Sequence, residues 1–450
     1  MGGEEQLQAS SFGEKFSWGV SSAACQTEGA YLDDGKGPSI WDTFTDRKGK
    51  ICNNDHARVA CNFYHLYPED LSIIRQLNIP NFRFSLAWSR IIPGGTGAVN
   101  PMGLDYYDRL IDNCLEKGID PWVTLYHWDL PQALELKGGW TNRDVVSWFS
   151  DYVSVCAKRF GDRVGHWMVM NEPMVFTGAG YFLGVHAPGR RGVRNFFPAV
   201  HHSVLAMAEG ARILKSACPD AEVGSTFSCS MIEPQTTSRW DTAAANRVDA
   251  LLNRLFIEPA LGMGYPVKDV PVLRKLEKYM LPGDDQKMIA NLDFAGVQNY
   301  TREIVSFSLF TPYVHARLVD AKRRTKDITE MNWEVYPPSI YHMLKKFDAY
   351  PGIPKLYVTE NGAAFKDVET AGRVHDERRI NYLKDYIAQV FKAKQEGCKV
   401  EGYFVWTLTD NFEWAEGYRP KFGIVKVDPE TQRRTVKDSG RWYGDFLSGR

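Results

Sequence analysis

The sequence is poor in cysteine and has no long apolar run. It contains eight cysteines among 450 residues, and no two of them form a CxxC pair or stand with histidines at zinc-site spacing. We therefore expect reduced, mostly buried thiols rather than a disulfide scaffold or a metal centre. No apolar stretch reaches the roughly 18 to 20 residues that a bilayer span requires. The opening MGGEEQLQAS lacks the basic and apolar regions of a secretory signal, which predicts a cytosolic protein with no membrane partner.

The chain also lacks an excess of either charge. Lysine and arginine total 54 against 55 aspartates and glutamates, so the formal net charge is −1. Such a balance gives no electrostatic reason to expect nucleic acid or an anionic membrane as a partner. No dinucleotide-binding or phosphate-binding motif stands in the required context, so we predict no organic cofactor. A small neutral molecule is the expected partner.

What the sequence does contain is a series of short β-type segments separated by helix-like stretches. Eight segments of this kind occur, FSWGVSSAAC from Phe16, NFRFSLAW from Asn81, PWVTLYHW from Pro121, GHWMVMNEP from Gly165, EVGSTFSC from Glu222, LDFAGVQNY from Leu292, KLYVTENG from Lys355 and VEGYFVWTLTD from Val400. Eight strands that alternate with helices indicate a (β/α)8 TIM barrel. Because no linker-like or low-complexity segment interrupts the series, we expect one α/β domain over residues 1–450, with a flexible tail over about residues 1–10.

The intervals between these strands are unequal. The segments after Pro173, Cys229 and Tyr300 are long, and in a barrel such βα loops build walls over the carboxyl-terminal face of the sheet. The last of them ends in NWEVYPP, from Asn332, which could fold back over a site at that face.

Two glutamates follow predicted strands directly. Glu172 stands in Asn171-Glu172-Pro173 after the fourth strand, and Glu360 stands in a Thr-Glu-Asn-Gly string after the seventh. A carboxylate at the end of an apolar strand loses hydration and requires a partner or a chemical task. A single such glutamate is more often structural, but two at strand ends match the pair of carboxyl groups that glycoside hydrolysis needs.

Polar and aromatic side chains suited to a neutral sugar also follow the strands. Amide, imidazole and carboxylate groups hydrogen-bond hydroxyls, whereas an indole covers the apolar face of a pyranose. Each of these side chains, taken alone, could have a purely structural role. Their common position at the strand ends favours a role in sugar binding. The candidates are Gln26, His127, Trp128, Asn171, Trp406, Glu413 and Trp414.

Over nearly its whole length the chain resembles glycoside hydrolase family 1, the β-glucosidase family. The resemblance rests on five ordered motifs, FSWGVSSAACQTEGA from Phe16, LYHWDLPQ from Leu125, MNEP, VTENG and WTLTDNFEWAEGYRPKFGI from Trp406. It implies a retaining β-glycosidase that removes terminal non-reducing β-D-glucosyl residues, with galactosyl and fucosyl residues as further candidates, through a covalent glycosyl-enzyme intermediate. A transglycosidase with the same residues and a catalytically silent sugar-binding relative are the alternatives.

The resemblance also implies a role for each site residue. Glu172 is expected to be the acid and base and Glu360 the nucleophile, with their carboxyl groups about 5 to 5.5 Å apart. Nearby Glu360 is expected to raise the pKa of Glu172. Arg83 resembles the arginine that pairs with the nucleophile, and Tyr300 the phenol that hydrogen-bonds it.

The remaining motif positions resemble those that hold the sugar. The residues expected around the non-reducing sugar are Gln26, His127, Asn171, Glu413, Trp414 and Phe422, with Trp406 as its platform. Trp333 resembles the aromatic residue on the leaving-group side.

The chain departs from the family pattern at two positions. Gln298 stands where the family usually has asparagine, near the substrate, and Cys25 stands where tyrosine is common. We expect Cys25 to serve packing. The 6-phosphosugar enzymes of the family carry serine at the position of Glu413, and the thioglucosidases carry glutamine at that of Glu172, so an O-glycosidase for unphosphorylated sugars is favoured.

Overall fold

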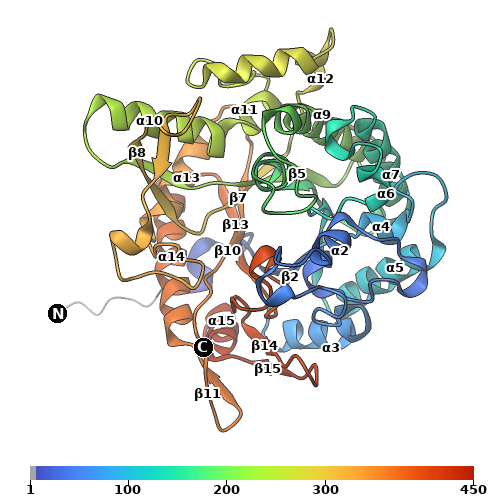
Figure 1. Ribbon diagram of the computed structural model, residues 1–450. Helices are drawn as coiled ribbons and strands as arrows, with labels where there is room; N and C mark the ends of the chain where they lie inside the picture. The colour runs from blue at the N-terminus through green and yellow to red at the C-terminus, as the bar shows by residue number, and fades with distance from the viewer. Residues whose placement is uncertain (1–6) are drawn as a thin grey trace.

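The computed structural model describes residues 7–450, and its centre is a closed barrel of eight parallel strands (Figure 1). The strands follow one another around the barrel in chain order, and β1 closes it by pairing with both β13 and β2. The barrel strands are β1 (Ser17–Ser21), β2 (Asn81–Ser85), β3 (Asp120–Tyr126), β4 (His166–Asn171), β5 (Glu222–Ser228), β7 (Phe294–Gln298), β10 (Leu356–Asn361) and β13 (Val400–Trp406). All eight predicted segments form these strands, and the predicted (β/α)8 barrel is confirmed.

Helices surround the barrel (Figure 1). They are α1 (Ala24–Thr27), α2 (Ile40–Thr45), α3 (Phe63–Gln76), α4 (Trp88–Ile91), α5 (Pro101–Glu116), α6 (Gln132–Glu135), α7 (Val145–Phe160), α8 (Pro173–Thr177), α9 (Val193–Ala217), α10 (Arg239–Asp249), α11 (Ile257–Ala260), α12 (Asp284–Lys287), α13 (Pro338–Asp348), α14 (Glu377–Gln395) and α15 (Asp438–Ser448). In α14, Leu383, Tyr386, Ile387 and Val390 are buried. This three-and-four spacing places one apolar stripe against the barrel.

The amino-terminal half of the barrel interior is filled by large side chains. Trp122, Met168, Phe294, Tyr357 and Phe404 form one buried cluster. A Cβ atom on Gly19 would lie 2.3 Å from the ring of Phe404, so this position accepts only glycine beside that ring. The barrel is therefore packed at this end, and space for a ligand is left at the carboxyl ends of the strands.

The long loops contain secondary structure of their own, as expected. Three short strands form a separate sheet in the order β6 (Met231–Pro234), β8 (Arg302–Phe307) and β9 (Ala316–Leu318). Two hairpins, β11 (Val368–Thr370) with β12 (Arg373–His375) and β14 (Val425–Val427) with β15 (Arg434–Val436), follow later in the chain. The three-stranded sheet joins the loop after β5 to the loop after β7, so the two loops form one wall.

Helices of other types, most of them a single turn, complete the fold. The 3-10 helices are η1 (Ala9–Phe12), η2 (Asp33–Gly35), η3 (Cys52–Asn54), η4 (Gly139–Thr141), η7 (Pro271–Tyr279), η8 (Ala321–Arg323) and η9 (Trp414–Glu416), and the π-helices are η5 (Gly178–Leu183) and η6 (Ala250–Arg254). Of the flexible tail expected over residues 1–10, residues 1–6 lie outside the described residues. Ala9 and Phe12 of η1 are buried, so the expected flexible tail does not include Ala9.

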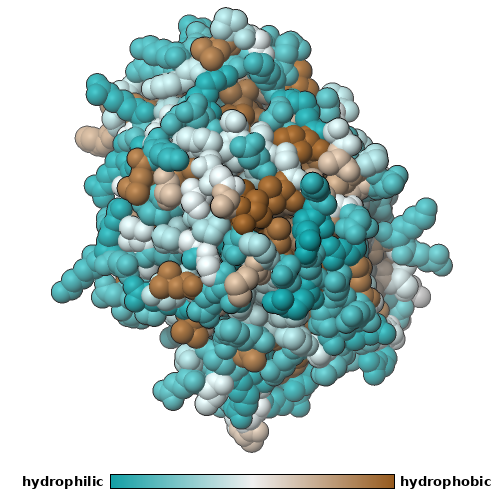
Figure 2. Space-filling model, turned by 90° about the vertical axis from the view of Figure 1, so that its right-hand side faces the viewer, coloured by the Kyte–Doolittle hydropathy of each residue, from teal (hydrophilic) through white to brown (hydrophobic). Residues whose placement is uncertain are grey.

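On the face seen in Figure 2, hydrophobic residues form small groups between hydrophilic ones. Within residues 7–450, no helix combines the length and the apolar character of a membrane span. All eight cysteines are free, and six of them are buried.

Candidate active site

A cavity of about 340 Å³ opens at the carboxyl ends of the barrel strands and contains both predicted catalytic glutamates. Ten of the residues predicted from the sequence line it, namely His127, Trp128, Glu172, Tyr300, Trp333, Glu360, Trp406, Glu413, Trp414 and Phe422. The other four, Gln26, Arg83, Asn171 and Gln298, are completely buried around it. The structure therefore brings all the predicted site residues into one region.

Glu172 lies at the junction between β4 and α8. Its backbone is left-handed, with φ of 44°, and its N–H donates to the carbonyl of Thr226 at 2.9 Å. The side chain is buried, and burial raises its pKa well above the ordinary value. The nearby charge of Glu360 adds to this rise, while the Ser228 hydroxyl opposes it. The expected rise is confirmed in direction, but burial contributes more than Glu360 does. Burial and the charge of Glu360 therefore both favour the protonated form of Glu172.

Glu360, near the end of β10, has a partner on each carboxyl oxygen. Arg83 donates from Nη1 to Oε1 at 2.5 Å, and Tyr300 donates from Oη to Oε2 at 2.7 Å. Burial raises the pKa of Glu360, whereas the charge of Arg83 and both hydrogen bonds oppose that rise. The two glutamates thus differ: Glu360 has a cation and a phenol that favour its ionised form, whereas burial and its neighbour disfavour ionisation of Glu172.

Asn171 connects several residues beneath the cavity. Its Oδ1 atom accepts from Arg83 Nη2 at 2.5 Å, from Gln298 Nε2 at 2.8 Å and from Thr226 Oγ1 at 2.9 Å. Its Nδ2 atom lies 3.1 Å from Nε2 of His127. Burial and the charge of Arg83 lower the pKa of His127, so its ring is neutral and accepts this hydrogen bond. His127 Nδ1 has no hydrogen-bond partner among the described residues and remains able to bind a ligand.

Gln26 and Glu413 form a second polar group. Gln26 Nε2 donates to the carbonyl of Phe412 at 3.0 Å and lies 3.4 Å from Glu413 Oε2. Its Oε1 atom is buried and has no partner in the described part of the chain. Burial, followed by the charges of Glu360 and Glu416, raises the pKa of Glu413 to about 8. The sequence suggested a carboxylate at this position, whereas its surroundings favour a carboxylic acid, which both donates and accepts hydrogen bonds.

Aromatic rings cover two sides of the cavity. On one side, the rings of Trp128 and Trp414 lie 4.5 Å apart. On the other, Trp333 lies 5.2 Å from Tyr300 and 6.1 Å from Phe422, between ring centroids. The contact between Trp333 and Tyr300 confirms that the NWEVYPP segment folds back over the site.

Other lining residues were not predicted as site residues. Val175 and His186 follow β4, Ser228, Cys229 and Ser230 end or follow β5, and Thr301, Glu303 and Met331 follow β7. Ala415 and Glu416, next to the predicted Trp414, complete the lining. The expectation that long loops wall the site points to these segments, but it does not select single residues.

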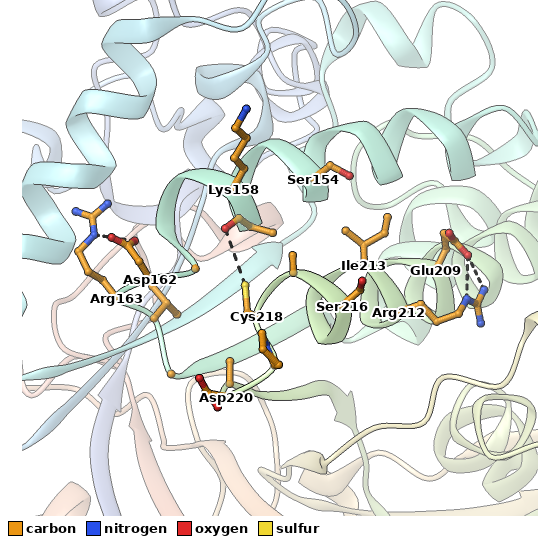
Figure 3. A pocket seen from close by; sticks show the side chains of 17 residues that line it. Ser154, Lys158, Asp162, Arg163, Glu209, Arg212, Ile213, Ser216, Cys218 and Asp220 are labelled. Carbon is orange, nitrogen blue, oxygen red and sulfur yellow. Dashed lines mark hydrogen bonds and ion pairs between the residues drawn. The ribbon is translucent and has the colours of Figure 1, made fainter.

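A larger hollow, of about 1000 Å³, lies at the amino ends of β4 and β5, between the ends of α7 and α9 (Figure 3). Its charged side chains are largely paired with each other, as in the ion pairs of Arg163 with Asp162 and of Arg212 with Glu209. None of the predicted site residues lines this hollow. Barrel enzymes carry their chemistry at the opposite end of the strands, so the smaller cavity is the candidate active site.

No group of three or more His, Cys, Asp or Glu side chains within residues 7–450 is arranged to hold a metal ion. The chemistry available in the cavity comes from the two carboxyl groups and the hydrogen-bonding and aromatic groups around them. These groups suit acid-base and nucleophilic chemistry on a polyhydroxylated ligand.

Comparisons with known proteins agree with this arrangement. The chain is 44% identical over 443 residues to beta-glucosidase A of Thermotoga maritima, covering 98% of both chains. It is 37% identical to beta-glucosidase 42 of Arabidopsis thaliana, covering 98% of this chain and 94% of the relative. The structure of the T. maritima beta-glucosidase in complex with deoxynojirimycin superposes with a TM-score of 0.93, at 44% identity, over 97% of this chain and 98% of the other. Its complex with galacto-hydroximolactam gives a TM-score of 0.91 over the same shares. The family model for glycosyl hydrolase family 1 matches residues 8–450, and the chain belongs to this family.

Proposed function

We propose that this protein is a retaining β-glucosidase that hydrolyses terminal non-reducing β-D-glucosyl residues. The observation that carries the proposal is the pair of glutamates in one cavity with opposite surroundings. Glu360 is paired with Arg83 and Tyr300, whereas burial and Glu360 itself hold the proton on Glu172. Such a division of roles between two carboxyl groups is what glycoside hydrolysis requires.

In the first step, Glu360 attacks the anomeric carbon while Glu172 gives its proton to the leaving-group oxygen. The glycosidic bond breaks, the leaving group departs as an alcohol, and a glycosyl ester forms on Glu360. In the second step, Glu172 is a carboxylate and takes a proton from water, whose oxygen attacks the same carbon and releases Glu360. This mechanism predicts a separation of about 5 to 5.5 Å between the carboxyl groups.

The sugar would lie between Trp406, as its platform, and the polar groups of His127, Gln26 and Glu413. Support comes from the unpartnered buried atoms His127 Nδ1 and Gln26 Oε1, because an unpaired buried polar atom is costly unless a ligand satisfies it. Glu413, as an acid with a pKa of about 8, has both a donor and an acceptor for sugar hydroxyls. Because Glu413 can both donate and accept hydrogen bonds, galactosyl and fucosyl residues are further candidates for the bound sugar.

The test is hydrolysis of 4-nitrophenyl β-D-glucoside by the wild type, by Glu360→Ala and by Glu277→Ala, where Glu277 is an exposed acid outside the cavity. We expect Glu360→Ala to lose at least about 10⁴-fold in kcat, with partial rescue by azide, and Glu277→Ala to retain full activity. The first released sugar, observed by NMR, should be the β-anomer. Activity of Glu360→Ala close to that of the wild type would refute the nucleophile assignment.

Product analysis in the presence of an added sugar acceptor separates hydrolysis from transglycosylation. Free glucose should dominate at low acceptor concentration. Sugar binding without turnover of an activated glucosyl fluoride would instead support a catalytically silent relative.

We further propose a cytosolic location and a small neutral substrate, supported by the eight free thiols and the balanced charge.

A further inference from the structure

Glu303 lies on the wall of the active-site cavity. Glu303 belongs to β8 and lines the same cavity as Glu172 and Glu360. Within residues 7–450, its carboxyl group makes no hydrogen bond and no ion pair, while the nearby Arg324 is paired with Glu334. The carboxyl group of Glu303 is therefore free to contact a molecule in the cavity.

The position of Glu303 places it on the side of the cavity where the leaving group must lie. On β6 its register partner is Ile232, and the two residues before β6, Cys229 and Ser230, also line the cavity. Ser228, just upstream, also lines the cavity, and its hydroxyl opposes the rise in the pKa of Glu172. This wall thus runs from the proposed general acid to Glu303. Because the general acid protonates the leaving-group oxygen, the leaving group extends along this wall.

The lining of the cavity is acidic and aromatic. It includes Glu303 and Glu416 besides the three glutamates of the inner site, and it contains no lysine or arginine. An anionic leaving group would meet like charge and no cation on the lining itself, because nearby Arg324 lies outside the lining and is paired with Glu334. Trp333 and Met331 supply an apolar surface close by. Burial raises the pKa of Glu303 to about 7, with Arg324 opposing the rise and Glu334 adding to it, so a fraction of this group is ionised at neutral pH.

We propose that Glu303 is the specificity-determining residue of a leaving-group subsite that favours aglycones carrying an ammonium group and disfavours aglycones carrying a carboxylate or phosphate. The inference rests on the proposed β-glucosidase activity and names the class of its aglycone. A carboxylate binds an ammonium group through charge-assisted hydrogen bonds, which are about twice as strong as neutral ones.

The test compares three β-D-glucosides that differ at one substituent of the aglycone, 4-(aminomethyl)phenyl, 4-(hydroxymethyl)phenyl and 4-carboxyphenyl, at pH 7.5. For each substrate, kcat/KM of Glu303→Gln is divided by that of the wild type, which cancels intrinsic differences between the leaving groups. We expect the ratio to fall to about 0.1 for the cationic substrate, equivalent to about 1.4 kcal/mol, to rise several-fold for the anionic one, and to stay within twofold for the neutral one.

Glu277→Gln removes the same charge from an exposed position outside the cavity and should leave all three ratios near one. Glu303→Asp keeps the charge and should preserve the preference for the ammonium substrate. This variant also tests the subsite if Glu303→Gln folds poorly. Equal ratios for the three substrates in Glu303→Gln would overturn the subsite while leaving the proposed function intact. Failure of the wild type to hydrolyse any of the three would overturn the proposed function, and this inference with it.

Discussion

Arg83 donates a hydrogen bond to Glu360 from a position where both side chains are almost completely withdrawn from solvent. The two atoms are 2.5 Å apart, and the exposed fractions of the side chains are 0% and 5%. The other terminal nitrogen of the same guanidinium group binds Asn171, next to Glu172. One planar cation therefore fixes the nucleophile relative to the end of β4, a geometry that arginine provides and lysine does not.

Replacing Arg83 by methionine should remove the charge that keeps Glu360 ionised. We expect kcat/KM to fall by at least about 10²-fold at pH 6, because less of Glu360 is then in the ionised form that attacks the anomeric carbon. The acidic limb of the pH profile should move to higher pH, because Glu360 then ionises less readily. Full pH profiles of the variant and of Arg433→Met, an exposed arginine, provide the measurement and its control. An unshifted acidic limb would contradict this role of Arg83.

The order of the elements and the place of the catalytic pair were predictable from the sequence. Each barrel strand is a short apolar run followed by turn residues, and such local patterns survive in the fold because each strand is buried on both faces. Glu172 and Glu360 were recognisable because they end such runs. The resemblance to glycoside hydrolase family 1 predicted that the pKa of Glu172 is raised. The sequence did not predict that burial is the larger cause of this rise, because burial depends on tertiary packing.

Contacts between distant segments could not be predicted in the same way. Gln298 was expected near the substrate; it lies completely buried beside the cavity and donates to Asn171, a contact that the sequence does not reveal. Ser228 comes to line the same cavity as Glu172 only when β4 and β5 pair. The protonation of Glu413 depends on burial and on Glu360, which is far away in the sequence.

The raised pKa of Glu172 predicts the alkaline limb of the activity profile. As pH rises through this pKa, Glu172 loses the proton that it must give to the leaving group, and kcat/KM should fall for substrates with poor leaving groups. The Glu172→Gln variant should lose this limb with a 2,4-dinitrophenyl leaving group, which needs no proton. A retained alkaline limb in that experiment would assign the limb to another residue.

The same shift predicts that Glu172 lowers stability at neutral pH. The folded-state pKa lies well above the unfolded value of about 4.3. The folded protein therefore holds a proton that the unfolded chain has lost, and its relative stability falls as pH rises above about 4.3 up to the folded-state pKa. Because glutamine cannot ionise, Glu172→Gln should have a higher Tm than the wild type at pH 8 and a smaller advantage at pH 4. Calorimetry at the two pH values tests this, and an advantage that is equal at both would contradict it.

Gly362 should tolerate no side chain, because β10 and β13 approach each other closely at the end of the barrel. A Cβ atom at this position would lie 1.8 Å from the carbonyl oxygen of Trp406. We expect Gly362→Ala to lose about 1 to 3 kcal/mol of unfolding free energy and to lose activity, since the forced shift separates Glu360 from the proposed sugar platform. Gly165→Ala, where no atom lies within 4 Å of the added carbon, should unfold near the wild-type midpoint in urea. Equal midpoints for the two variants would show that β13 adjusts freely.

Glu413 should act through hydrogen bonds rather than through its charge. Burial raises its pKa to about 8, so glutamine, which is neutral and both donates and accepts, imitates the acid better than leucine does. We expect Glu413→Leu to lose about 10²-fold or more in kcat/KM for the glucoside, because the buried hydroxyls of the sugar are left unpaired. Glu413→Gln should retain more activity than Glu413→Leu and should change the ratio of glucoside to galactoside hydrolysis, because its amide has fixed donor and acceptor positions. Steady-state kinetics on 4-nitrophenyl β-D-glucoside and β-D-galactoside decide the matter. Equal losses in the two variants would mean that the charge of the carboxylate, which only the wild type can carry, is what binds the sugar.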